Sequence, residues 1–131
     1  VGPKVLLINK YSASDGDLFP WSFKANKIGK VIGTRTWGGI VGISGPLPYM
    51  DDTDVRVPFF TNFDAKTGQW IVENHGVDPD ILIDNDPIKE QMGEDQQLNK
   101  AIEVIMQELK DRKPLPKVPA PRTFKDLGLK Q

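Results

Sequence analysis

The apolar positions at the start of the chain predict a strand, a helix and a second strand. Val5–Ile8 is a continuous apolar run, which is typical of a strand covered on both faces in a parallel sheet. Apolar residues recur at helical spacing over residues 18–26, with Asp17 as the expected N-cap and Pro20 in the first turn. A short apolar run at 31–33 then completes a β-α-β unit.

The middle of the chain predicts further strands. Residues 55–57 alternate between apolar and polar, and residues 59–63 and 69–73 flank a Thr-Gly turn, which predicts a hairpin. A second short apolar run, 81–83, leaves a loop that is rich in turn-forming residues.

The last third of the chain predicts helices and then an extended tail. Asp86 and Pro87 begin a helix as cap and first residue, and Gly93 interrupts it. The longest helix then runs over residues 94–110, and the tail beyond it is rich in proline. We expect the helix's apolar stripe to belong to the core; its members are Leu98, Ala101, Ile102, Ile105, Met106 and Leu109. These elements predict an α/β fold with layered helices and a parallel sheet.

Composition excludes several classes of function. The chain has 131 residues, with 17 Lys and Arg against 18 Asp and Glu, so no surplus of positive charge points to nucleic acid. It has no cysteine and therefore no disulfide or thiolate chemistry, and no apolar run is long enough to span a membrane. These features leave the cellular compartment open. Because a buried strand comes almost first, we expect the chain to be a C-terminal portion of a longer protein.

Two segments resemble ligand loops but lack the required spacing. The glycine-rich residues 34–45 contain neither phosphate-binding pattern, so they are either a strand edge that accepts an extended peptide or a flexible loop. The acidic residues Asp51, Asp52 and Asp54 lack the glycine and terminal glutamate of a calcium loop, which favours a solvated turn.

The segment YSASDGD at residues 11–17 joins the first strand to the first helix. A strand, a tight turn and a helix N-terminus together can present a hydroxyl group beside free backbone amides, so Ser14 is a candidate nucleophile. The turn alone favours an ordinary serine at a helix entry. Glu73 and His75 are two residues apart and could form a local pair, but we interpret His75 as a loop residue.

Three ordered segments resemble motifs of the tricorn-like serine proteases, relatives of the tail-specific C-terminal processing peptidases. Residues 9–20 (NKYSASDGDLFP) resemble the active-serine motif, residues 33–43 (GTRTWGGIVGI) the substrate-side strand and residues 72–80 (VENHGVDPD) the glutamate motif. With the helix that follows, the resemblance covers most of the chain up to the proline-rich tail.

The resemblance implies a role for each matching residue. Ser14 would be the nucleophile, the backbone amide of Asp15 one oxyanion-hole donor, and Glu73 the carboxylate of the catalytic network. Gly42 and Ile43 would line the cleft and pair with the substrate backbone. The family's fold is layered, like that of the crotonases and the Clp protease. Its histidine base comes from upstream of the serine strand.

These implications define our expectations. Residues 1–112 would be the C-terminal portion of a serine endopeptidase domain, and residues 113–131 an extended tail. The substrate would be a peptide or unfolded protein, no metal or cofactor is implied, and we expect a homo-oligomer. Without the upstream histidine, the isolated chain should be inactive. Two alternatives remain: a peptide-binding module without catalysis and, more remotely, a crotonase-like acyl-CoA enzyme.

Overall fold

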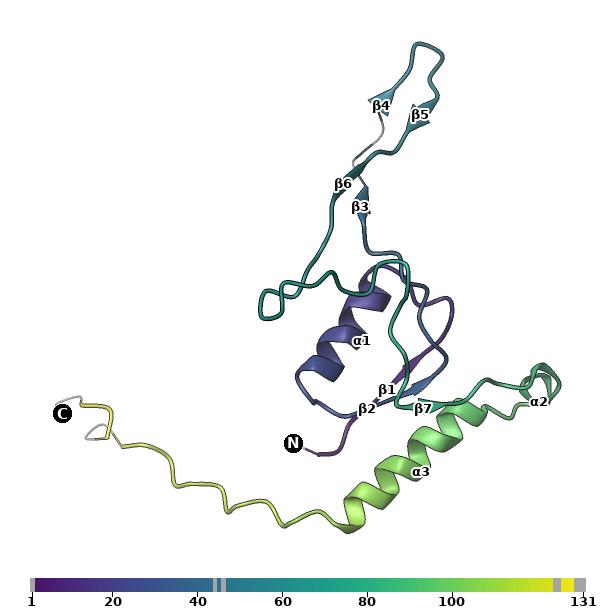
Figure 1. Ribbon diagram of the computed structural model, residues 1–131. Coiled ribbons are helices and arrows are strands. Elements are labelled where there is room, and N and C mark those ends of the chain that lie inside the picture. The colour runs from purple at the N-terminus through teal and green to yellow at the C-terminus, as the bar shows by residue number, and fades with distance from the viewer. Residues whose placement is uncertain (1, 44, 46, 124–125, 129–131) are drawn as a thin grey trace.

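A three-stranded parallel sheet forms the centre of the computed structural model, which describes residues 2–43, 45, 47–123 and 126–128 (Figure 1). Its strands are β1 (Val5–Ile8), β2 (Lys30–Gly33) and β7 (Ile81–Leu82), in the order β1-β2-β7. Leu6 lies opposite Val31, which sets the register of β1 against β2. The β-α-β unit predicted from the apolar runs is therefore confirmed.

Two helices cover this sheet from opposite sides (Figure 1). On one side, Phe23 of α1 (Asp15–Ala25) packs against the buried side chains of Ile8 and Val31, with Leu6 beside them. On the other side lies α3 (Gln96–Lys110), which contacts the same two strands. Burial of apolar side chains between these layers forms the core, as the layered arrangement predicts.

The start of α1 differs from the prediction. Ser14, and not Asp17, is the N-cap, and Pro20 lies inside the helix instead of in its first turn. A proline inside a helix leaves one carbonyl without its amide partner, which disfavours such an arrangement. The Asp17 side chain instead accepts hydrogen bonds from three backbone amides, those of Ser14, Gly38 and Gly39.

Two short antiparallel ladders form an arm that projects from the body (Figure 1). Nearer the body, β3 (Gly42–Ile43) pairs with β6 (Pro58–Phe60), and farther out β4 (Leu47–Pro48) pairs with β5 (Asp54–Val55). The predicted hairpin between residues 59–63 and 69–73 is wrong in its extent. Only Phe63 and Trp70 form a bridge there, because β6 pairs with β3 instead.

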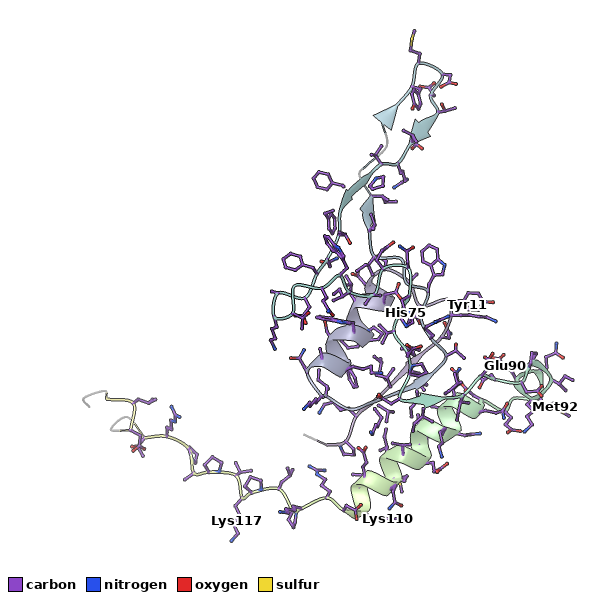
Figure 2. All side chains as sticks on the ribbon, viewed as in Figure 1. Tyr11, His75, Glu90, Met92, Lys110 and Lys117 are labelled. Atoms are coloured by element: carbon purple, nitrogen blue, oxygen red, sulfur yellow. The ribbon has the colours of Figure 1, made fainter. Side chains whose placement is uncertain are left out.

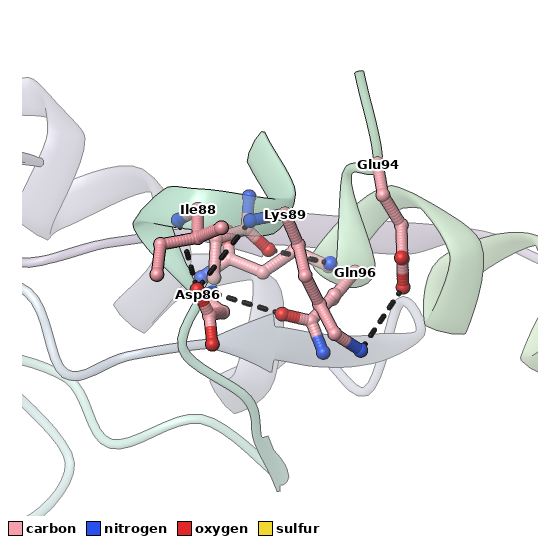
Figure 3. A network of polar contacts seen from close by, with 7 residues as sticks. Asp86, Ile88, Lys89, Glu94 and Gln96 are labelled. Atoms are coloured by element: carbon pink, nitrogen blue, oxygen red, sulfur yellow. Dashed lines mark hydrogen bonds and ion pairs between the residues drawn. The ribbon is translucent and has the colours of Figure 1, made fainter. Parts of the chain in front are cut away.

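The connection from β7 to α3 contains the short helix α2 (Pro87–Gln91). Asp86 is its N-cap, as predicted, and accepts the Ile88 amide at 2.8 Å. The Asp86 amide in turn donates to Gln96 Oε1 at 2.8 Å, and Lys89 pairs with Glu94 at 3.5 Å (Figure 3). These contacts fix the corner before α3.

The expectation that the whole apolar stripe of α3 belongs to the core is wrong. Ala101 is buried, but Leu98, Ile102, Met106 and Leu109 are 40–55% exposed. The helix contacts β1 and β2, and its buried residues are Gln97 and Ala101, so most of the apolar stripe lies outside the buried part of the helix.

Beyond α3 the chain runs away from the body without helix or strand over residues 113–121, which include Lys117 (Figures 1 and 2). Proline-rich segments favour extended conformations of this kind. Within the part of the chain described, no helix has the length and apolar character needed to cross a membrane.

Candidate functional site

Ser14 lies on a sharp turn between the first strand and the first helix. Its backbone has φ 57° and ψ −113°, a combination that residues other than glycine rarely adopt. The residue is exposed and forms the N-cap of α1. A strained strand-to-helix turn that presents an exposed serine is the geometry of a nucleophile elbow.

Ser12, the other serine of the segment, forms hydrogen bonds within the loop. Its hydroxyl accepts a hydrogen bond from the Asn9 amide at 3.1 Å, and its own amide donates to the Asn9 carbonyl at 2.9 Å. The Asn9 side chain also accepts the Tyr11 amide at 2.9 Å. These bonds close the turn before Ser14, so Ser12 has a structural role.

The amide of Asp15 is the first of α1. In the described residues, the amides of Ser14, Gly16 and Asp17 all have acceptors, whereas the Asp15 amide has none. Amides in the first turn of a helix lack partners within the helix and favour negative charge. The Asp15 amide is therefore available to an anion next to Ser14.

The Asp17 carboxylate, which is fully buried, connects this turn to the glycine-rich loop. Its Oδ2 atom accepts the amides of Ser14 at 3.0 Å and Gly39 at 3.1 Å, and its Oδ1 atom accepts the Gly38 amide at 2.8 Å. The sequence interpretation missed this role. The available signal was the Ser-x-x-Asp spacing, which predicts a capping box that begins at Ser14.

Backbone contacts reinforce the same connection. The Ser14 amide also donates to the Gly39 carbonyl at 3.2 Å, and the Trp37 amide donates to the Ser12 carbonyl at 2.9 Å. The serine turn and the glycine-rich loop are therefore joined directly through their backbones as well as through Asp17. Such a network of hydrogen bonds favours one position of the two segments relative to each other.

Glu73 binds the continuation of this loop. Its Oε2 atom accepts the amides of Ile40 at 2.7 Å and Val41 at 2.9 Å. The residues on either side, Val72 and Asn74, have φ of 65° and 61°. Positive φ is unusual for a β-branched residue, and such strain persists only where surrounding contacts enforce it. The backbone therefore holds the Glu73 carboxylate against the loop.

Two glycines allow the loop of Glu73 and the glycine-rich loop to approach each other closely. Gly38 and Gly76 both have φ 86°, and a Cβ atom on Gly76 would lie 2.2 Å from the Thr36 carbonyl oxygen. The Asn74 amide donates to the Gly38 carbonyl at 2.8 Å, and the Val77 amide donates to the Thr36 hydroxyl at 2.7 Å. The loop of Glu73 and the glycine-rich loop thus form one unit.

Gly42 and Ile43 follow directly as strand β3. One edge of this strand is paired with β6, and a Cβ atom on Gly42 would lie 2.2 Å from the Phe60 ring. Ile43 is exposed. Within the described residues β3 pairs with no strand on its other edge, and an unpaired edge is a place where an extended peptide can add a strand.

The possible local pair of Glu73 and His75 does not form. The Nε2 atom of His75 (labelled in Figure 2) lies 2.8 Å from Asp78 Oδ2, and both side chains are exposed, at 60% and 61%. Among the described residues, no three His, Asp or Glu side chains are arranged to hold a metal ion. In the acidic segment, Asp51 accepts a hydrogen bond from the Thr53 hydroxyl at 2.7 Å.

Comparison with known proteins identifies relatives of this arrangement. The model of Peptidase family S41 matches residues 1–83. The tricorn protease of Thermoplasma volcanium is 44% identical over 112 residues, which are 86% of this chain and 11% of that protein. Tricorn protease homolog 1 of Streptomyces coelicolor is 40% identical over 110 residues, 84% of this chain and 10% of that protein.

A solved structure agrees with these sequence matches. The crystal structure of the tricorn protease superposes with a TM-score of 0.76 at 42% identity, over 83% of this chain and 11% of that one. The chain therefore spans about a tenth of the length of the relatives that it matches.

Proposed function

The chain belongs to Peptidase family S41, and on that premise we propose that it carries the nucleophile side of a serine endopeptidase active site. The observation that supports this most directly is the strained elbow at Ser14, with the free amide of Asp15 beside it. The substrate is a peptide or an unfolded protein segment. The tricorn proteases among its relatives agree with this substrate class.

In the proposed reaction, the Ser14 hydroxyl oxygen attacks the scissile carbonyl carbon. The hydroxyl proton passes to a general base and then to the leaving amine, which departs as the C–N bond breaks. Water, deprotonated by the same base, then cleaves the acyl ester and regenerates Ser14. The Asp15 amide donates to the oxyanion in both steps, because charge develops on the carbonyl oxygen there.

The general base in this proposal is a histidine outside residues 1–131. His75 is the single histidine of the sequence, and it pairs with Asp78. General-base assistance contributes roughly 10²–10⁴-fold to such a reaction. We therefore expect the isolated chain to hydrolyse peptides negligibly.

Glu73 completes the proposed site as a carboxylate that supports the relay. Its hydrogen bonds to the Ile40 and Val41 amides would also fix the strand on which the substrate lies. Gly42 and Ile43 would pair with the substrate backbone through the free edge of β3, as in other complexes where a peptide adds a strand to a sheet.

We extend the proposal to the whole domain. Residues 1–112 would be the C-terminal portion of a catalytic domain with a layered crotonase- or Clp-like fold, and residues 113–131 a tail. The exposed apolar side chains of α3 and of the arm support assembly into a homo-oligomer.

The test compares Ser14→Ala with Ser12→Ala in the full-length protein that contains this chain. We expect Ser14→Ala to abolish peptide hydrolysis and labelling by a fluorophosphonate, which reacts with activated serines. Ser12→Ala should still be labelled, because Ser12 serves the loop and not the chemistry. Hydrolysis at the wild-type rate by Ser14→Ala would end the assignment.

A peptide-binding module without catalysis is the second candidate, favoured by the engagement of His75 with Asp78. It predicts that the full-length protein binds peptides but is not labelled at Ser14. Stoichiometric labelling at Ser14 would exclude it.

A further inference from the structure

The Asp17 carboxylate differs from the other helix-capping carboxylates of this chain. Asp86 and Asp95 are exposed and accept amides from the first turns of the helices that they cap. Asp17 is 0% exposed, and the three amides that it accepts lie outside α1's own turns, at the N-cap Ser14 and at Gly38 and Gly39 of another loop. Capping of a helix requires neither this burial nor these distant partners.

Burial of a carboxylate is costly unless its oxygens are hydrogen-bonded. Asp17 takes part in no ion pair among the described residues. The hydrogen bonds from the three amides therefore offset the cost of burying its carboxylate. Both oxygens of the carboxylate accept an amide, at 2.8 Å for Oδ1 and at 3.0 and 3.1 Å for Oδ2. Asp17 is therefore fixed in place, and the groups that bind it are fixed with it.

We propose that Asp17 is a positioning residue that sets Ser14 relative to the substrate strand; this inference rests on the proposed peptidase function. One atom, Oδ2, binds both the Ser14 amide and the Gly39 amide. The next two residues after Gly39 donate their amides to Glu73. A shift of Oδ2 would thus displace Ser14, the loop and the Glu73 carboxylate relative to one another.

The substitution Asp17→Asn tests this positioning role, because it leaves the volume of the side chain almost unchanged. An asparagine keeps one oxygen, so its NH₂ group must face either the Gly38 amide or the amides of Ser14 and Gly39. Two donors that face each other cannot hydrogen-bond, so one part of the network is released. A misplacement of about 1 Å in reacting groups can lower a rate by roughly 10²-fold.

The experiment uses the full-length protein and measures turnover per active site. Fluorophosphonate titration counts the competent sites, and peptide hydrolysis then gives kcat per titrated site, with KM from the same data. We expect Asp17→Asn to lower kcat per site by about 10- to 100-fold, with KM changed by less than about threefold. A purely structural role would reduce the number of titratable sites and leave kcat per site unchanged.

Asp95→Asn is the matched control, because it makes the same substitution at a capping carboxylate of α3. Asparagine also caps helices well, so this variant should retain wild-type turnover. Wild-type kcat per site in Asp17→Asn, with Ser14→Ala inactive, would overturn this inference alone. Hydrolysis by Ser14→Ala would instead overturn the proposed function on which it rests.

Discussion

Glu73 Oε2 lies 2.7 Å from the Ile40 amide nitrogen, so this carboxylate binds the backbone that leads into strand β3. The Val41 amide donates to the same oxygen at 2.9 Å. One side chain thereby links the loop after the Phe63–Trp70 bridge to the loop that is tied to Ser14. If Glu73 belongs to the catalytic network, it therefore also holds the structure of the loop.

Substitution of Glu73 separates these two roles. Glu73→Gln keeps an oxygen that can accept the Ile40 and Val41 amides, so its free energy of unfolding should fall by no more than about 1 kcal/mol. Glu73→Ala removes the acceptor and should cost about 1.5–3 kcal/mol, the range for hydrogen bonds to a charged group. Denaturant unfolding of both variants measures the difference.

Peptide hydrolysis by the full-length protein then tests whether catalysis needs the negative charge of Glu73. If the carboxylate supports the relay, Glu73→Gln should lose about tenfold or more in kcat despite its near-normal stability. Full activity in Glu73→Gln would restrict the residue to its structural role.

Gly76→Ala should be far more destabilising than Gly93→Ala, although both glycines have φ 86°. A Cβ atom on Gly93 would meet nothing within 4 Å, so this variant carries only the backbone strain, about 1–2 kcal/mol. A Cβ atom on Gly76 would also collide with the Thr36 carbonyl, which adds about 1–3 kcal/mol. Equal free energies of unfolding in the two variants would contradict the close approach of the loops.

The sequence predicted those parts of the fold that depend on local signals. The apolar run Val5–Ile8 is strand β1, and the Asp86-Pro87 pair begins α2 with Asp86 as its cap. Gly93, at φ 86°, interrupts the helical region as expected. Each of these signals acts within a few residues, so the rest of the fold has little influence on it.

The errors lie where distant segments decide the outcome. The residues of β6 pair with β3 and not with residues 69–73, because an apolar pattern defines a strand but not its partner. Asp17 was taken as an N-cap because Pro20 follows it closely, but the amides of Gly38 and Gly39, far along the chain, determine its position. Ser14 and Glu73 were chosen from the family resemblance, and their catalytic roles stay predictions.

Acid should weaken the contact between α1 and the segment before β7. Asp80 pairs with Lys24 at 3.1 Å and accepts the Val31 amide at 2.8 Å. Burial raises the pKa of Asp80, but the Val31 amide and the Lys24 ammonium together lower it more, so the pKa lies below its usual value. This contribution to stability is complete above the ordinary carboxyl pKa of about 3.9 and is lost as the pH falls through the lowered value.

Asp80→Asn should remove this pH dependence. At neutral pH we expect it to lower the free energy of unfolding by about 0.2–1 kcal/mol, the range for partly exposed ion pairs. Below the lowered pKa of Asp80 the variant and the wild type should converge. Asp84→Asn is the control, since Asp84 forms no ion pair among the described residues. A constant difference between wild type and Asp80→Asn from neutral pH to about pH 2 would rule out the mechanism.

The exposed side of α3 should make the 131-residue chain associate in solution. Leu98, Ile102, Met106 and Leu109 lie on one side of the helix and are 40–55% exposed. A contiguous apolar patch of this kind favours burial against another surface, since each buried Å² is worth about 25 cal/mol. The combined variant Ile102→Gln and Met106→Gln should shift the sedimentation profile toward the monomer and leave the melting temperature within a few degrees of the wild type.

Val118→Gln provides the matched control for that measurement. Val118 is 91% exposed and belongs to the segment without helix or strand that follows α3. An isolated exposed apolar residue is common on protein surfaces and contributes little to association. Its replacement should therefore leave the sedimentation profile unchanged. If Val118→Gln dissociates the chain as strongly as the α3 variant does, the tail and not the helix holds the copies together.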